Sequence, residues 1–199
     1  MRTHLGAFFP KTPRSIRLGK DLEDIKALKR DSTILDFEAS GDPPDRYLIT
    51  FHGNSLIPGK EGEVKIGKKQ QVEIYMGAGY PGQQPDIHWK TPILHPNISG
   101  GSICLGNFGR EWTPYSKLPV LLEVLWDYSR LAILNPYGGY GGESGKTWED
   151  LRREFQFPVD RRPLRDKVLA NDEGSSIVRP SGDEFDIVIM PDDEGQCEP

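Results

Sequence analysis

The sequence predicts an α+β fold in which helices cover one face of an antiparallel sheet. Apolar residues recur at helical spacing over residues 15–30. Four short β-rich or alternating segments follow, separated by turns, at residues 33–39, 46–52, 70–76 and 86–90. A second helical pattern begins near residue 118. Strands grouped together between helices indicate a four-stranded meander rather than alternating strand–helix units.

The N-terminal helix is expected after an irregular arm of residues 1–13. Its apolar stripe consists of Leu18, Leu22, Ile25 and Leu28. Its first turns are basic on the outer side, through Arg14, Arg17 and Lys20. From charge alone, the interpretation is a solvated helix face.

Two further helices are predicted after the sheet. Pro119 stands near the start of an apolar pattern that runs to about Leu134, where Asn135-Pro136 ends it. Thr147 and Asp150 have the spacing of an N-cap pair and predict a short helix to about Phe155. The glycine-rich loop between these helices, residues 138–142, is expected to be flexible. Residues 53–67 are expected to be a loop with one short strand.

The domain organisation follows from composition. Residues 1–13 form the arm, 14–158 the folded domain, and 159–199 an acidic, largely flexible extension. From residue 160 onward there are five basic and eleven acidic residues, a net charge of −6, against 20 and 19 before it. An apolar island, Ile187, Val188, Ile189 and Met190, interrupts the acidic tail. Within its acidic frame it resembles a short motif that adds a β-strand to a ubiquitin-like protein, and the alternative is a strand that packs back on its own domain.

Composition also excludes several classes. No apolar run is long enough to span a bilayer, and no signal peptide is recognised, so no membrane partner is expected. The domain is nearly neutral and the tail acidic, which argues against a nucleic-acid partner. Two cysteines and four histidines show no zinc spacing, so no metal and no cofactor are expected. A reducing cytoplasmic location suits two cysteines of unequal context.

The segment with the clearest chemistry runs from residue 80 to 114. Cys104 follows a turn of small residues, Ser99-Gly100-Gly101-Ser102, and His95-Pro96-Asn97 stands just before that turn. A thiol in a glycine-rich loop with a nearby amide indicates a nucleophile with a stabiliser for a carbonyl oxygen. The alternative for Cys104 is a buried structural thiol.

This segment resembles the active-site region of ubiquitin-conjugating enzymes. The shared motifs, in order, are Tyr80-Pro81 with Pro85, His95-Pro96-Asn97, Gly101-Ser102-Ile103-Cys104-Leu105, and Trp112 with Pro114. The resemblance implies the fold of that family and a cis peptide bond at Tyr80-Pro81. It also implies that the basic helix residues Arg14, Arg17 and Lys20 dock on an activating enzyme.

The resemblance further implies roles for the site residues. Cys104 would accept the C-terminus of a ubiquitin-like modifier as a thioester and pass it to a target lysine, with or without a ligase. Asn97 would stabilise the oxyanion, or else hold the turn by backbone hydrogen bonds. His95 is expected to be structural rather than a base. Pro96, Gly101, Tyr80 and Trp112 are expected to shape the site by packing.

Two departures from the family pattern suggest a divergent member, of the kind expected in a prokaryotic system with its own modifier. Asn97 and Cys104 are seven positions apart, one fewer than is usual in the family. Acidic residues common near the thiol are missing, since Gly106 stands two positions after the cysteine. Asp127, Tyr140 and Glu143 are the candidate substitutes for the acid that prepares the incoming amine.

Two other functions remain open from the sequence. A non-catalytic module that only binds a ubiquitin-like protein would not need Cys104. A cysteine hydrolase would need His88 or His95 in contact with the thiol, and no motif supplies that contact.

Overall fold

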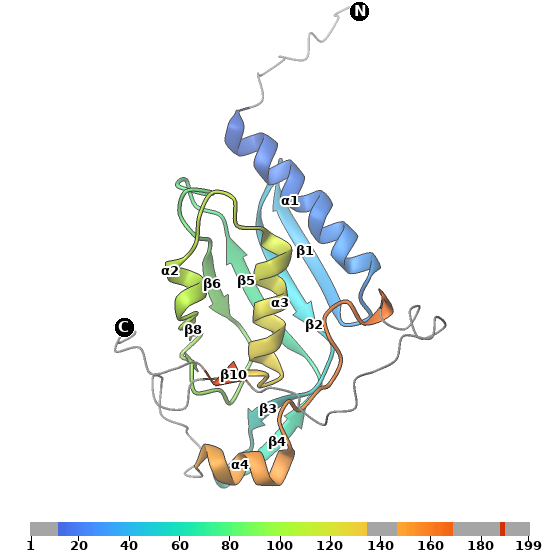
Figure 1. Ribbon diagram of the computed structural model, residues 1–199, viewed down its shortest axis with the longest axis vertical. Helices are drawn as coiled ribbons and strands as arrows, with labels where there is room; N and C mark the ends of the chain where they lie inside the picture. The colour runs from blue at the N-terminus through green and yellow to red at the C-terminus, as the bar shows by residue number, and fades with distance from the viewer. Residues whose placement is uncertain (1–11, 135–146, 169–187, 190–199) are drawn as a thin grey trace, which may run out of the picture.

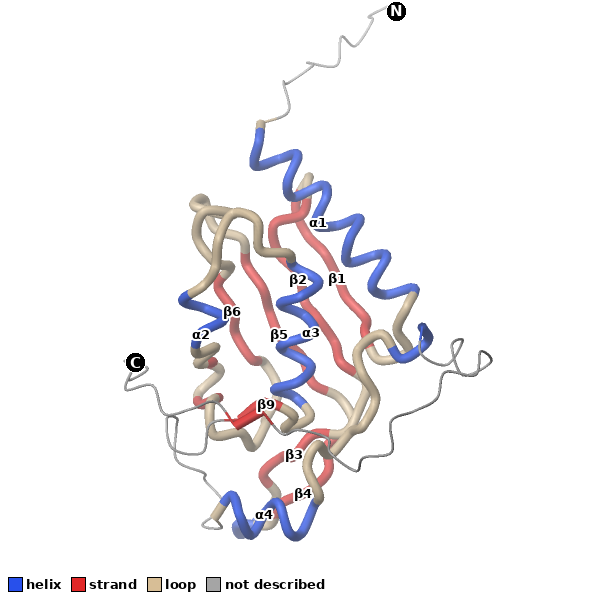
Figure 2. Tube along the Cα trace, in the orientation of Figure 1, coloured by secondary structure: helices blue, strands red, loops and turns tan. Residues whose placement is uncertain are grey.

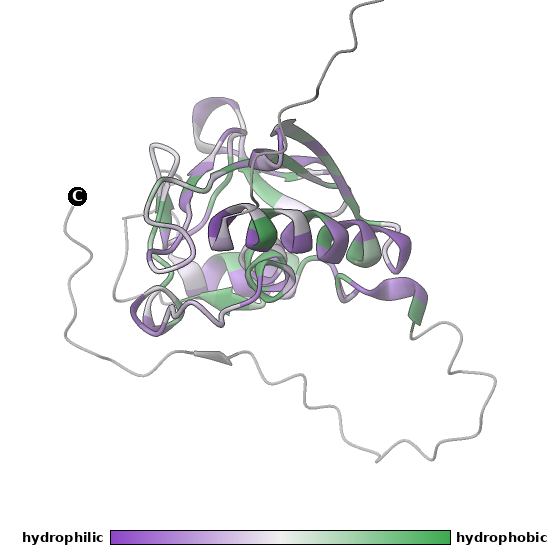
Figure 3. Ribbon diagram, turned by 90° about the horizontal axis from the view of Figure 1, so that it is seen from above, coloured by the Kyte–Doolittle hydropathy of each residue, from purple (hydrophilic) through white to green (hydrophobic). Residues whose placement is uncertain are grey.

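The computed structural model describes residues 12–134 and 147–168, together with the backbone of Val188–Ile189. Two helices, α1 (Pro13–Arg30) and α3 (Leu118–Ser129), lie on the same face of a sheet (Figure 1). Seen from above, the curved sheet forms one layer and these helices form the other (Figure 3). The predicted α+β class is confirmed.

The main sheet is an antiparallel meander, as the sequence predicts (Figure 2). Its strand order is β1-β2-β5-β6. The strands are β1 (Leu35–Gly41), β2 (Pro44–Phe51), β5 (Gln70–Tyr75) and β6 (Asp86–Trp89). Register follows the apolar alternation, with Tyr47 opposite Ile74 and Ile49 opposite Val72. These four side chains are fully buried, so one face of the sheet packs in the core.

Helix α1 begins at Pro13, inside the segment that the sequence assigned to an irregular arm. The Thr12 side chain caps it by accepting a hydrogen bond from the Ser15 N–H, and proline suits the first turn. Leu18, Ile25 and Leu28 are buried against the sheet. The predicted apolar stripe is therefore the packed face of the helix.

Helix α3 is shorter than expected: it ends at Ser129 rather than near Leu134. The chain leaves the helix at Leu131, which adopts a positive φ of 61°. Ile133–Leu134 then forms the short strand β9. Leu131 and Leu134 are buried in a second apolar cluster, separate from the main core.

This second cluster explains the region that the sequence assigned to a loop. Residues 53–67 contain a hairpin, β3 (Ser55–Pro58) with β4 (Val64–Gly67), joined through a short 3-10 turn. Helix α4 (Trp148–Phe155) packs beneath it, capped by the predicted Thr147–Asp150 pair. Leu56 and Leu151 contribute buried side chains from the hairpin and the helix.

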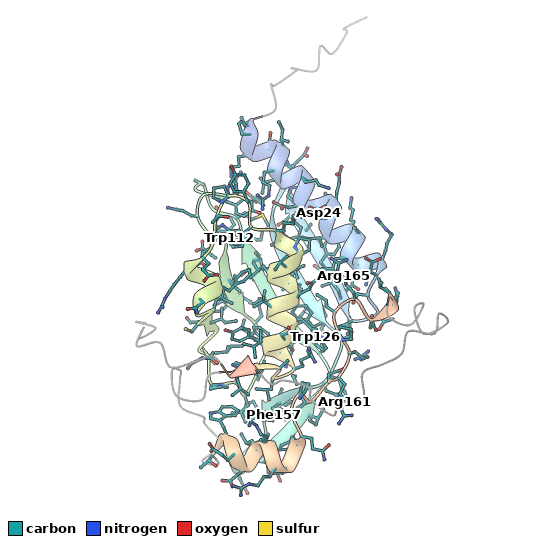
Figure 4. All side chains as sticks on the ribbon, in the orientation of Figure 1. Asp24, Trp112, Trp126, Phe157, Arg161 and Arg165 are labelled. Carbon is teal, nitrogen blue, oxygen red and sulfur yellow. The ribbon has the colours of Figure 1, made fainter. Side chains whose placement is uncertain are left out.

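The packed body continues past the expected boundary at residue 158. The Val159 N–H donates to the Arg130 carbonyl, and the buried Asp160 carboxylate accepts from the Asn54 N–H. Leu164 is 3% exposed and belongs to the main core. Arg165, labelled in Figure 4, bridges to Asp31 and Glu123. Residues 159–168 are thus part of the domain, because this segment supplies a buried apolar side chain and ion pairs to it.

Val188–Ile189 forms strand β10, which pairs in parallel with β9. Of the two alternatives for this island, the structure therefore shows the strand that docks on its own domain. Ile187 and Met190, assigned with it to modifier binding, lie outside the described residues. Among the described helices, none has the length and apolar character needed to cross a membrane.

We predict that Leu164→Ala lowers the free energy of unfolding by about 2–4 kcal/mol, because it leaves a cavity in the main core. Val168→Ala, at a side chain that is 42% exposed, is the control and should cost less than about 0.5 kcal/mol. Urea unfolding of the reduced full chain measures both. Equal effects of the two substitutions would show that residues 159–168 do not pack on the domain.

Candidate active site

A two-residue turn accounts for the shortened spacing between Asn97 and Cys104. Strands β7 (Ile98–Ser99) and β8 (Ser102–Ile103) form a minimal hairpin around Gly100 and Gly101. Both glycines have positive φ, 56° and 86°, as a tight hairpin turn of this type requires. The Gly101 carbonyl accepts a hydrogen bond from the Trp89 N–H at 2.8 Å, which fastens the hairpin to the edge strand β6.

His95 is buried and uses both ring nitrogens. Its Nδ1 accepts a hydrogen bond from the Asn97 N–H at 3.0 Å, and its Nε2 lies 3.0 Å from the Ile133 carbonyl oxygen. A carbonyl can only accept, so the proton is on Nε2. Burial lowers the pKa of His95 to about 3, against a smaller opposing effect of the bond to Ile133. The ring is therefore neutral at physiological pH and links the Asn97 backbone to the Ile133 carbonyl.

Cys104 lies between strand β8 and the short helix α2 (Asn107–Arg110), and it is half-buried. Its N–H donates to the Asn97 carbonyl at 2.9 Å, which places the cysteine beside the His-Pro-Asn loop. The structure holds Cys104 in a disulfide, where the sequence analysis expected a reduced thiol. The other cysteine of the sequence, Cys197, lies outside the described residues. The thiolate chemistry expected of Cys104 therefore requires that this disulfide first be reduced.

Asn97 and Pro96 are both buried in the loop, and Asn97 is 4% exposed. The backbone of Asn97 joins His95 to Cys104, because its N–H donates to the first and its carbonyl accepts from the second. The main chain of Asn97 therefore contributes to holding the turn. A role for the side-chain amide is a separate matter and stays a prediction.

Tyr128 is a contact that the sequence analysis did not single out. Its hydroxyl donates to the Cys104 carbonyl at 3.1 Å, and its ring lies 5.1 Å from that of His95. It lies on the buried face of α3, where the sequence pattern predicts only that an aromatic residue packs in the core. The sequence carries no signal that would have distinguished its hydroxyl from packing.

Tyr80 and Trp112 pack against each other, and their role in shaping the site stays a prediction. The Trp112 indole N–H donates to the Pro81 carbonyl at 3.0 Å, and its ring lies 6.2 Å from Tyr80. Figure 4 labels Trp112 in the loop that precedes α3. The Tyr80-Pro81 bond is cis, as the family resemblance implied.

The side chains of the three basic residues assigned to docking differ in exposure and in their hydrogen bonds. Arg17 donates to Asp21, to the Tyr80 hydroxyl and to the Pro114 carbonyl, and its side chain is only 19% exposed. It therefore links α1 to the site loops, and a docking role for these three residues stays a prediction. Arg14 donates to the Met76 carbonyl, whereas Lys20 is 62% exposed.

Of the three acid candidates, the structure describes Asp127 alone. Asp127 pairs with Arg130 at 2.7 Å near the end of α3, and the pKa of its carboxyl is raised mainly by burial. Tyr140 and Glu143 lie outside the described residues. Within the described part of the chain, no three His, Cys, Asp or Glu side chains gather as a metal site would require.

Fold and site define the class as an α+β domain that presents a cysteine beside a buried His-Pro-Asn loop. Comparison with known families makes the assignment specific, since residues 17–162 match the family described as Ubiquitin-conjugating enzyme. The match covers more than half of the chain, so the protein belongs to the ubiquitin-conjugating enzyme family.

Similar proteins carry the same description. "Probable ubiquitin-conjugating enzyme E2 31" of Arabidopsis thaliana is 35% identical over 54% of this chain and 68% of its own length. "Ubiquitin-conjugating enzyme E2 27" of the same plant is 38% identical over 53% of each chain. "Ubiquitin-conjugating enzyme E2 16" of Schizosaccharomyces pombe is 29% identical over 43% of this chain and 57% of its own. The chain thus spans little more than half the length of two of these relatives.

One solved structure, of a putative ubiquitin conjugating enzyme from Plasmodium yoelii, is similar at 26% identity with a TM-score of 0.45. It covers 61% of this chain and 75% of its own. The prokaryotic source suggested by the departures stays a prediction.

We predict that Gly101→Ala destabilises the domain more than Gly100→Ala. Both positions have positive φ, but a Cβ at Gly101 would come within 2.2 Å of the His88 ring, whereas one at Gly100 meets nothing within 4 Å. Thermal or urea unfolding should give losses of about 2–4 and about 1 kcal/mol respectively.

Repeating the pair in a His88→Ala background tests the cause. The gap between the two alanine variants should shrink by about 1 kcal/mol once the ring is removed. An unchanged gap would mean that the His88 contact does not restrict position 101.

Proposed function

We propose that this protein is a ubiquitin-conjugating acyl carrier that holds a ubiquitin-like modifier as a thioester on reduced Cys104. The observation that carries the proposal is the placement of Cys104. It is half-buried at a loop, and its backbone is tied to Asn97 within a chain of the ubiquitin-conjugating family. The domain that performs this reaction extends from Pro13 through residue 168.

The proposed chemistry is two acyl transfers. In the first, the Cys104 thiolate attacks the modifier's C-terminal carbonyl, which the activating enzyme presents as a thioester, and that enzyme's thiolate leaves. In the second, a target lysine amine attacks the same carbonyl. A C–N bond forms, the C–S bond to Cys104 breaks, and the amine proton passes to a base or to water. Atoms and charge balance without a cofactor.

Asn97 is the proposed stabiliser of the tetrahedral oxyanion in both steps. A preorganised amide donor in such a position contributes about 3–4 kcal/mol to lowering a barrier. The buried loop that holds Asn97 supports this role, because its main chain is fixed on one side to His95 and on the other to Cys104. Preorganisation of this kind is what oxyanion stabilisation requires.

The incoming lysine must lose a proton, since an ordinary lysine is almost wholly charged at neutral pH. Tyr140 and Glu143 are proposed for this task. Asp127 is the weaker candidate, because its carboxylate is already engaged by Arg130.

The proposed partners are an activating enzyme, a ubiquitin-like modifier, a target lysine and, in some reactions, a ligase. Lys20 offers the most exposed positive charge of the basic helix turns and is the proposed centre of activating-enzyme docking. Arg14 is the second, at 34% exposure of its side chain. The proposed location is the cytoplasm, where a thiol can remain reduced.

The test is a loading assay with ubiquitin, a ubiquitin-activating enzyme and ATP. The protein is first reduced with dithiothreitol, which is removed before loading because thiols also cleave thioesters. We expect an adduct that dithiothreitol cleaves, no adduct for Cys104→Ala, and a thiol-resistant oxyester for Cys104→Ser.

An adduct that survives in Cys104→Ala would place the acyl group elsewhere and contradict the proposal. A reduced protein that forms no adduct at all would show that it does not carry ubiquitin. Circular dichroism of the Cys104→Ala variant provides the control that loss of the adduct is not loss of fold.

A further inference from the structure

Tyr128 connects helix α3 to the backbone of the reactive residue. Its hydroxyl donates to the Cys104 carbonyl, and the residue is 1% exposed. Because a backbone carbonyl can only accept, the phenol must be the donor. Burial raises the pKa of Tyr128 to about 12, so the hydroxyl keeps its proton at neutral pH.

Both peptide groups of Cys104 are thereby held. On the N-terminal side its N–H donates to Asn97, and on the C-terminal side its carbonyl accepts from Tyr128. The direction of the Cα–Cβ bond, and with it the sulfur, follows from these two peptide planes. Neither bond involves the sulfur itself.

The second of these bonds restrains a segment that would otherwise turn easily. Gly106, two positions after the cysteine, has a φ of 54°, a conformation in which glycine meets little steric restraint. Leu105 between them is 7% exposed and anchors the chain by packing. The Tyr128 hydroxyl adds a directional contact that apolar packing cannot supply.

Tyr128 also supports the loop on the other side of the thiol. Its ring packs 5.1 Å from that of His95, which in turn holds the Asn97 N–H. One buried side chain therefore contacts both the loop with the proposed oxyanion stabiliser and the loop with the nucleophile.

We propose that Tyr128 is a positioning residue for acyl transfer at Cys104, acting through its hydrogen bond to the Cys104 carbonyl. This inference rests on the proposed function, since it concerns the rate at which the loaded thioester is discharged. It assigns to the hydroxyl a role beyond filling the core.

The experiment compares wild type with Tyr128→Phe, which keeps the ring and removes only the hydroxyl. Reduced protein is loaded with ubiquitin, activating enzyme is quenched, and single-turnover discharge is followed over a range of free-lysine concentrations. We expect full loading of both proteins, an unchanged half-saturating lysine concentration, and a maximal discharge rate about 3- to 10-fold lower in Tyr128→Phe.

Trp126→Phe is the matched control. It also removes one donor from α3, the indole N–H that bonds the Arg162 carbonyl at 2.8 Å, a partner outside the loops that carry Asn97 and Cys104. Its loss of thermal stability should equal or exceed that of Tyr128→Phe, because the smaller ring also leaves a cavity in the core, while its discharge rate stays at the wild-type value. Equal discharge rates for Tyr128→Phe and wild type would overturn the proposal and leave Tyr128 a core residue.

A second measurement does not depend on loading. In reduced protein, the carbonyl ¹³C resonance of Cys104 should shift in Tyr128→Phe and not in Trp126→Phe, because only the first loses a bond to that carbonyl. An unshifted resonance overturns the inference. If wild type fails to load ubiquitin while the resonance shifts, the proposed function fails and the hydrogen bond itself is confirmed.

Discussion

The site depends on one buried imidazole that is hydrogen-bonded at both ring nitrogens. A buried polar group left without a hydrogen bond destabilises the fold by about 1–3 kcal/mol. A movement that broke either bond of the buried imidazole would therefore be costly. Here the partners are the Asn97 N–H and the Ile133 carbonyl. His95 thus fixes the distance between the loop that precedes the cysteine and the strand that follows helix α3.

This constraint explains why α3 ends early. The Ile133 carbonyl can face His95 only because the chain leaves the helix at Leu131 and becomes extended in β9. Apolar burial stabilises this change of direction, since Leu131 and Leu134 pack in the second cluster with Leu56 and Leu151. The hairpin β3–β4 and helix α4 therefore support the active-site loop through this cluster, although they lie outside the main sheet.

Much of the fold could be read from the sequence because its signals are local. The alternation in residues 46–52 and 70–76, the stripe of Leu18, Ile25 and Leu28, and the Thr147–Asp150 cap each depend on neighbours a few positions away. The features that were missed depend on tertiary contacts. Leu164 is one apolar residue in a charged segment, and only the core shows that it packs. The end of α3 is set by a buried cluster, not by Asn135-Pro136.

The same distinction applies to the site. Cys104, Asn97 and His95 were recognised because family motifs name them by order and spacing, and the structure brings them together. Arg17 was assigned to a docking surface because its charge is visible in the sequence, whereas its bonds to Tyr80 and Pro114 are not. Tyr128 was missed because a donor aimed at a backbone carbonyl leaves no trace in composition or periodicity.

The most direct test of this account is the tautomer and charge of His95, measured by ¹⁵N NMR of the imidazole nitrogens in the folded, reduced protein. The account predicts a neutral ring with the proton on Nε2 at neutral pH, unchanged down to about pH 5, well below the ordinary histidine pKa. A ring that titrates at about pH 6.5, or that carries its proton on Nδ1, would contradict the account.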